Sequence, residues 1–182
     1  HHDGGLVDPK GADSATLDPE ALDRFDYLFA TLKKRGIYLV TDFYTSRPLK
    51  EGDGISGNLS VPKALFPADP AALENWKKFV RNWMTHRNPY TGLTYAEDPA
   101  LVMVNLVNED NLDAFWNRTV ADRDRYAALF EPWKKERGCP DARADRGDRR
   151  FLEFLFELQN RRLAEMARFA KEELHVQAAV TS

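Results

Sequence analysis

Four polar residues stand together at the end of the most apolar stretch of the chain. Residues 101–107 are almost continuously apolar, and Asn108, Glu109, Asp110 and Asn111 follow them. Such a run suits a strand buried on both faces, as in a parallel sheet. Because the ligand crevice of parallel α/β folds lies beyond the carboxyl ends of the strands, Glu109 is expected on that rim, where a carboxyl group can exchange protons. Taken alone, an Asn-Glu pair is more often a solvated strand end.

The surroundings of this pair resemble a known family. The segment LVMVNLVNED at residues 101–110 is preceded by NPYTGL at residues 88–93 and followed by a long helical region. Together they resemble the fourth barrel strand of clan A glycoside hydrolases, the cellulase-like and mannanase-like enzymes. The resemblance implies that Glu109 is the general acid/base and that Asn108 contacts the 2-hydroxyl of the sugar. The sequence departs from the family at Asp110, where many members have proline.

Cleavage of a glycosidic bond needs a second carboxyl group, about 5 to 5.5 Å away for a nucleophile and about 6.5 to 9.5 Å away when water attacks. Asp110 neighbours Glu109 along the chain rather than across a cleft, so it is not assigned this role. Asp42 lies within a predicted strand and is at least as well explained as a buried, hydrogen-bonded carboxylate. The resemblance implies a nucleophilic Glu at the end of the seventh strand, which would follow Ser182. The chain by itself is therefore expected to be inactive.

Sugar binding calls for flat aromatic faces and polar side chains on the rim. Tyr44 and Trp116 lie just beyond predicted strand ends and are expected to contact substrate, whereas a core role is favoured for Phe115. His2 belongs to a polar opening segment that is either a tag remnant or the rim after an upstream strand. The resemblance favours the rim, and His2 is then a substrate-binding residue. No chemistry is assigned to the aromatic and histidine residues on helix stripes or before strands: Trp76, Trp83, Trp133, His86 and His175.

Capping residues and apolar periodicity predict the elements that position the rim. Asp18 and Asp69, each followed by proline, begin amphipathic helices over residues 18–35 and 69–87. Residues 37–44 have the aromatic and β-branched enrichment of a strand. The other predicted elements are a loop at residues 45–68, helices at about 120–138 and 148–174, and a strand at 176–180.

Helices and strands alternate along the chain, which predicts parallel strands and an α/β fold. A doubly wound sheet and a barrel both satisfy this order. No GxGxxG or phosphate loop follows any predicted strand, so the barrel is favoured. At 182 residues the chain is shorter than the roughly 250 of a complete barrel. We therefore expect one domain over residues 1–182, a fragment of a (β/α)8 TIM barrel truncated at both ends and holding about strands three to five with their helices.

Composition excludes several classes of protein. Apolar residues make up 43% and charged residues 30%, and no run approaches the roughly 20 apolar residues of a membrane span. The net charge of -3 gives no electrostatic reason to expect nucleic acid. One cysteine, Cys139, excludes an internal disulfide framework, and no Cys/His cluster has zinc-like spacing. No metal or cofactor is expected, the partner is a carbohydrate substrate, the fragment is prone to self-association, and the cellular compartment stays open.

Three functions remain open at this stage. The favoured one is part of a retaining glycosidase that acts on a β-linked polysaccharide or oligosaccharide. The second is a non-catalytic carbohydrate-binding barrel, which would lack the rim Glu on its seventh strand. The third is an unrelated α/β domain whose oxygen-rich residues 108–111 hold calcium or magnesium, although neighbouring residues on one strand end rarely converge on an ion.

Overall fold

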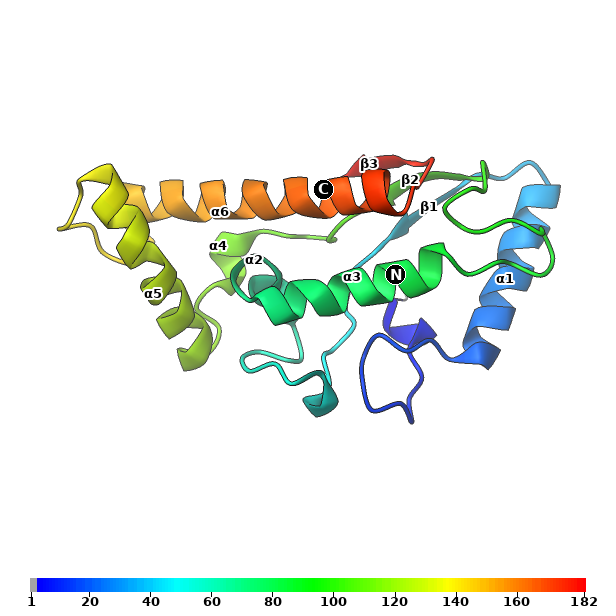
Figure 1. Ribbon diagram of the computed structural model, residues 1–182, viewed down its shortest axis with the longest axis horizontal. Coiled ribbons are helices and arrows are strands. Elements are labelled where there is room, and N and C mark those ends of the chain that lie inside the picture. The colour runs from blue at the N-terminus through cyan, green and yellow to red at the C-terminus, as the bar shows by residue number, and fades with distance from the viewer. Residues whose placement is uncertain (1–2) are drawn as a thin grey trace.

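A computed structural model describes residues 3–182 and shows a mixed α/β fold around a small parallel sheet (Figure 1). The strands are β1 (Leu39–Asp42), β2 (Leu101–Asn105) and β3 (Ala179–Thr181), and β2 lies in the centre with both neighbours parallel to it. The prediction of three parallel strands is confirmed, although each strand is shorter than expected. Three strands form an open sheet, so the closed barrel stays a prediction.

Side-chain caps start the two helices that flank the sheet, as the sequence predicts. In α1 (Pro19–Lys34) the Asp18 carboxylate accepts hydrogen bonds from the first free backbone N–H groups, and Asp69 does the same for α3 (Pro70–Met84). Each cap satisfies donors that have no partner within the helix, and the following proline has its φ preset for the first turn. These helices therefore begin at the predicted residues.

Two further helices form an arm that extends away from the sheet (Figure 1). The first, α5 (Val120–Arg137), begins at the Thr119 cap and ends at Gly138, whose φ of 63° is left-handed. The long helix α6 (Arg149–Arg168) runs back to the sheet and continues as a π-helical turn, η4 (Phe169–Glu173). Glycine is the residue that adopts left-handed φ without steric cost, which explains the sharp end of α5.

The connection from β1 to α3 contains helical turns that the sequence does not predict. The sequence predicts a loop over residues 45–68, but the connection holds the short elements η2 (Glu51–Asp53), η3 (Pro62–Ala64) and α2 (Leu65–Ala68). Four-residue helices are too short to show an amphipathic period, so tertiary packing determines them. Two more short turns lie elsewhere in the described chain: η1 (Asp3–Leu6) and α4 (Leu112–Phe115).

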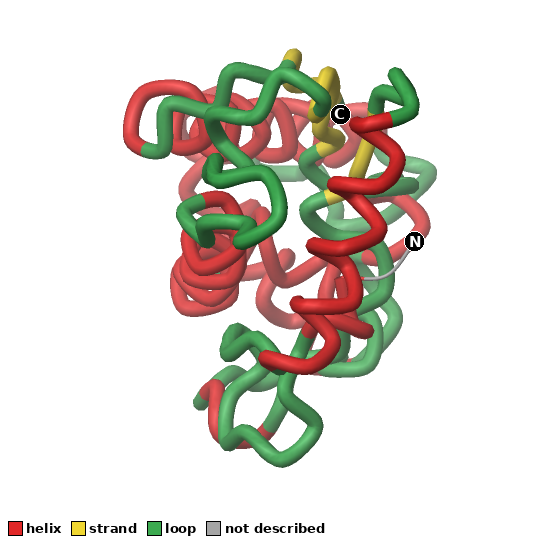
Figure 2. Tube along the Cα trace, turned by 90° about the vertical axis from the view of Figure 1, so that its right-hand side faces the viewer, coloured by secondary structure: helices red, strands yellow, loops and turns green. Residues whose placement is uncertain are grey.

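Two apolar cores hold these elements. The larger core joins the sheet to α1, α3 and the end of α6, with Trp76 and Trp83 buried and both in edge-to-face contact with Phe43. The smaller core lies between α2, α4, α5 and α6, around Phe130 and Phe151. Figure 2, viewed from the side of α1, shows how small the sheet is beside the helices and loops. The arm therefore has a core of its own.

Two of the strands carry apolar side chains that are open to solvent. Val40 of β1 is 56% exposed. Val102 of β2 is 40% exposed, although the sequence predicts burial of this central strand on both faces. Phe25, Leu28 and Val40 contribute to the lining of an apolar hollow of about 520 Å³ between α1 and β1. Among residues 3–182, no helix is long and apolar enough to cross a membrane.

Candidate functional site

The carboxyl ends of the strands form one continuous rim. Backbone hydrogen bonds of 2.8 Å join Phe43 N to Asn105 O and Leu106 N to Thr181 O, past the last paired residues. The segment that follows β2 remains tied to the segment that follows β1, because Asn108 N donates to the carbonyl oxygen of Tyr44 at 2.8 Å. The residues after β2 are thus held by both neighbouring strands.

The side chain of Glu109 projects from this rim. Its φ is 52°, in the left-handed region that residues other than glycine rarely adopt, and its side chain is 81% exposed. The next residue is fixed: the Asp110 carbonyl accepts from Gln159 at 2.6 Å, and its carboxylate accepts from the Ser182 hydroxyl at 2.8 Å. Rare backbone conformations persist only where the surroundings enforce them, and they are found mainly at functional sites. The Glu109 carboxyl therefore projects into solvent from a fixed backbone.

Lys63 is the residue of this site that sequence reasoning missed. It comes from η3, its side chain is 7% exposed, and its ammonium lies 3.2 Å from the Glu109 carbonyl oxygen and 3.8 Å from Glu109 Oε2. The same ammonium lies over the ring of Phe115, 5.1 Å from its centre. A lysine in a loop rich in glycine and proline is ordinarily solvated, so the sequence carries no signal for this contact.

The Asn108 amide and the rim carboxylates differ in what they contact. The Asn108 side chain is half-buried, and within residues 3–182 its amide makes no hydrogen bond. Asp42 accepts a hydrogen bond from the Asn105 amide at 2.8 Å, and Asp110 is bound to Ser182. Of the three rim carboxylates considered from the sequence, Glu109 is thus the one directed into solvent.

Tyr44 and Trp116 lie in the core, which corrects the expectation that their rings are open to a ligand. Tyr44 is fully buried against Phe66, with 4.8 Å between ring centres. Burial, helped by the Asp3 carboxylate, raises the pKa of Tyr44 far above its usual range. Trp116 is 3% exposed and packs against Phe151. Tyr44 turns inward onto α2, and Trp116 turns inward onto Tyr126 of α5 and Phe151 of α6. These contacts join segments that are far apart in the sequence, so the sequence does not reveal them.

Two further residues considered near the rim are Phe115, for which the sequence favours a core role, and His2, which is expected to bind substrate. Phe115 is half-buried, packs against the smaller core, and has the cations of Lys63 and Arg118 over its ring, each 5.1 Å from the centre. Phe115 therefore contacts Lys63, the residue whose ammonium binds Glu109. His2 lies outside the described residues.

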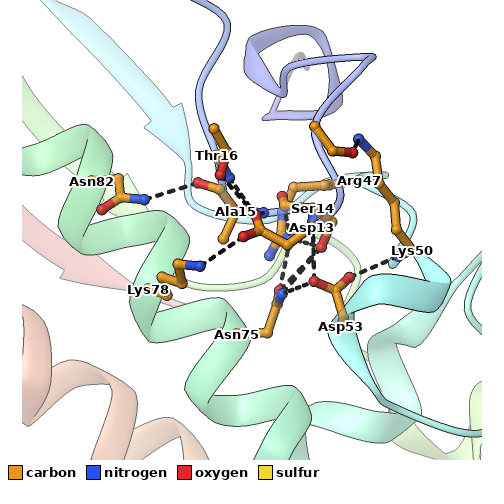
Figure 3. A network of polar contacts seen from close by, with 11 residues as sticks. Asp13, Ser14, Ala15, Thr16, Arg47, Lys50, Asp53, Asn75, Lys78 and Asn82 are labelled. Carbon is orange, nitrogen blue, oxygen red and sulfur yellow. Dashed lines mark hydrogen bonds and ion pairs between the residues drawn. The ribbon is translucent and has the colours of Figure 1, made fainter.

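A second polar cluster ties three distant segments together (Figure 3). The buried Arg47 guanidinium donates from Nη1 to the Ser14 carbonyl, the Ser14 hydroxyl and Asn75 Oδ1, each at 2.8 Å. Asn75 donates in turn to Asp53 at 2.8 Å. Phe79 lies under the guanidinium, 4.5 Å from ring centre to Cζ. These contacts anchor the loop after β1, which carries Lys63, to α3.

A third cluster lies at the opposite end of the sheet. The Asp26 carboxylate, from α1, is 2.7 Å from His86 Nε2 and accepts from the Tyr95 hydroxyl at 2.6 Å. Burial and this carboxylate raise the pKa of Tyr95 far above its usual range, so the phenol is a neutral donor. The cluster joins α1 to the connection after α3. It lies before the strands, at the end of the sheet opposite the rim.

Within residues 3–182, no group of three or more His, Cys, Asp or Glu side chains is arranged to hold a metal ion.

The chain was compared with known proteins. No protein-family model matches it, and no curated protein matches it. Among solved structures it is similar to the endo-beta-1,4-mannanase from Thermotoga petrophila, with 22% sequence identity and a TM-score of 0.43. The likeness covers 71% of this chain and 27% of the mannanase chain, so this chain spans about a quarter of the length of that enzyme. The similarity is distant.

Proposed function

We propose that this chain is part of a retaining glycoside hydrolase that acts on a β-linked polysaccharide or oligosaccharide, with Glu109 as its general acid/base. The observation that carries the proposal is the placement of Glu109. It is an exposed carboxyl group, at the end of the central parallel strand, on a left-handed backbone that its neighbours hold. The Asn108-Glu109 pair at this position is also the basis of the resemblance to clan A glycosidases.

The proposed reaction has two steps in which Glu109 changes role. First, its carboxyl group gives a proton to the leaving glycosidic oxygen while a second carboxylate attacks the anomeric carbon and forms a glycosyl ester. Next, the Glu109 carboxylate takes a proton from water, whose oxygen displaces that ester and releases the sugar. Asn108, which follows the strand beside Glu109, would bind the 2-hydroxyl through its amide.

The second carboxylate is proposed to come from outside residues 1–182. Asp42 and Asp110 are hydrogen-bonded to Asn105 and Ser182, and Asp110 is the neighbour of Glu109 along the chain. The family resemblance implies a glutamate at the end of a later barrel strand. The whole reaction therefore belongs to the protein encoded by the full reading frame, and tests of activity should use that protein.

The decisive experiment compares leaving groups. Glu109→Gln in the full reading-frame protein should lower the rate on natural glycosides by about 10² to 10⁴-fold, the usual worth of a general acid. The glycosylation step of a dinitrophenyl glycoside should change far less, because that leaving group departs without a proton. Pre-steady-state release of dinitrophenol measures this step directly.

Asp110→Asn is the matched control, since it neutralises the adjacent carboxylate. It should not produce a rate loss that depends on the leaving group. Equal loss on both substrates after Glu109→Gln would remove Glu109 from the acid role. Binding of oligosaccharides by the unmodified protein without any hydrolysis would instead favour the non-catalytic barrel.

A further inference from the structure

Lys63 is a lysine that the fold has largely removed from water. Its side chain is 7% exposed, whereas lysine is almost never buried without a partner. Its ammonium hydrogen-bonds the Glu109 carbonyl oxygen at 3.2 Å. Within residues 3–182, Glu109 is also the only acidic residue that forms an ion pair with it. The position of Lys63 is thus defined by Glu109.

Of these two contacts, the one to the backbone is the stronger. The Glu109 carboxylate is 81% exposed and 3.8 Å away, so water and salt screen the attraction between the charges. The carbonyl contact is a charge-assisted hydrogen bond, which is roughly twice as strong as one between neutral groups. The Phe115 ring lies 5.1 Å from the ammonium and shields it on one side. Lys63 therefore acts mainly on the backbone of Glu109.

This backbone needs a partner that holds it. A non-glycine residue with a φ of 52° persists where its surroundings enforce that conformation. The flanking residues are held by Tyr44 and Gln159, which bind Asn108 and Asp110. Lys63 is the residue that binds the carbonyl of Glu109 itself. Loss of that bond would let the peptide rotate and would redirect the carboxyl group.

We infer that Lys63 is a positioning residue for Glu109: its buried ammonium fixes the left-handed backbone that aims the carboxyl group at the leaving oxygen. This inference rests on the proposed function. A misplacement of about 1 Å in a proton donor can cost about 100-fold in rate. Lys63 makes no contact with substrate in this scheme. It changes the reaction rate only by changing the orientation of the Glu109 carboxyl group.

The test is Lys63→Met in the full reading-frame protein, with the same two substrates. The rate on a natural oligosaccharide should fall about 10 to 100-fold, while dinitrophenol release should fall less than about threefold. In a protein that already carries Glu109→Gln, Lys63→Met should cause no further loss of rate on the natural oligosaccharide. The effects of substitutions at residues that act as a unit are not additive. A crystal structure of Lys63→Met should show Glu109 outside the left-handed region.

Lys77→Met is the matched control. Lys77 is also mostly buried, with 14% of its side chain exposed, pairs with Glu74 and Glu165, and lies 5.9 Å from the centre of the Phe169 ring, away from the rim. Its loss should lower thermal stability without any dependence on the leaving group. If Lys63→Met does not fold, Lys63→Gln, which keeps a shorter N–H donor, takes its place in the same comparison.

The outcomes separate the two proposals. If Glu109→Gln shows no dependence on the leaving group, the proposed function fails, and the inference about Lys63 fails with it. If Glu109→Gln shows that dependence and the Lys63 variant slows both substrates equally, only the inference is overturned. A further loss in the double variant, or the same behaviour from Lys77→Met, also overturns it.

Discussion

The backbone N–H of Asn108 donates to the carbonyl oxygen of Tyr44 at 2.8 Å, three residues beyond the end of β2. The pairing of β1 with β2 thus continues into the segment that carries Glu109. A side chain on such a segment has less freedom than one on a surface loop, because its backbone hydrogen bonds belong to the sheet. This is the kind of support that an acid/base residue requires.

Asn108→Ala tests the proposed contact with the sugar 2-hydroxyl. This hydrogen bond should strengthen as the ring approaches the oxocarbenium-like transition state, so kcat should fall by about 10 to 100-fold and KM should change little. Steady-state kinetics on an oligosaccharide measure both quantities. Asn111→Ala is the control, because Asn111 is exposed and its side chain makes no cap hydrogen bond to α4. An effect on KM alone would mean that Asn108 only binds substrate.

Tyr44→Phe tests whether Tyr44 belongs to the core or to a sugar-binding surface. Its buried hydroxyl has no hydrogen-bond partner within residues 3–182, so its removal should leave the free energy of unfolding unchanged or slightly higher. Tyr44→Ala should cost about 3 to 5 kcal/mol through the cavity it leaves. Denaturant unfolding measures both. A loss of oligosaccharide affinity in Tyr44→Phe with unchanged stability would contradict the core assignment.

Asp13→Asn tests a pH effect. The ammonium of Lys78, 2.7 Å away, and the N–H groups of residues 15 and 16 hold the pKa of Asp13 well below its usual range. Because the folded pKa is lower than the unfolded value of about 3.9, the ion pair stabilises the fold above about pH 4, and this is lost as the pH falls further. Asp13→Asn should cost about 1 kcal/mol at pH 7.

The difference between Asp13→Asn and the parent protein should shrink below about pH 4. Thermal unfolding at pH 7, 5 and 3 checks it, and Lys78→Met should reproduce most of the effect. A difference that stays constant down to pH 3 would show that the charge of Asp13 is not responsible.

Gly52→Ala tests the close approach of the loop after β1 to the opening segment. A Cβ at Gly52 would lie 2.1 Å from the carbonyl oxygen of Ala12, so one backbone segment must move. Overpacking of this kind costs about 1 to 3 kcal/mol. At Gly4 the nearest atom to an added Cβ is 3.6 Å away, so Gly4→Ala is the control and should be nearly neutral. Thermal midpoints compare the two, and equal midpoints would contradict the close approach.

Residues 1–182 expressed alone should self-associate or pack loosely. Leu28 is 50% exposed and Val40 is 56% exposed beside the unpaired edge of β1, and such edges template association. Each exposed apolar side chain forgoes about 1.5 to 3 kcal/mol of burial energy. Size-exclusion chromatography and near-ultraviolet circular dichroism measure the result. A monodisperse monomer with a sharp aromatic signal would show that this segment is an independent domain.

The parts of the fold that local chemistry determines were predictable. Asp18 and Asp69 predict where their helices begin, because a capping carboxylate followed by proline acts within the first turn of the helix. The rim position of Glu109 follows from the end of an apolar run. The burial of Tyr44 and the contact of Lys63 with Glu109 depend on the short helices α2 and η3, which lie in a loop of more than 20 residues. Their place is set by packing between distant segments, for which periodicity gives no sign.

The cluster around Arg47 bears on how the protein unfolds. Its hydrogen bonds join residues 28, 33 and 61 positions apart, so three segments must meet before the cluster is complete. Contacts with such large sequence separation are closed late, because the chain entropy is lost before the contacts can compensate for it. We expect variants at Ser14, Arg47 or Asn75 to accelerate unfolding with little change in the folding rate. The lifetime of the folded loop that presents Lys63 to Glu109 would then be set by a cluster that takes no part in the chemistry.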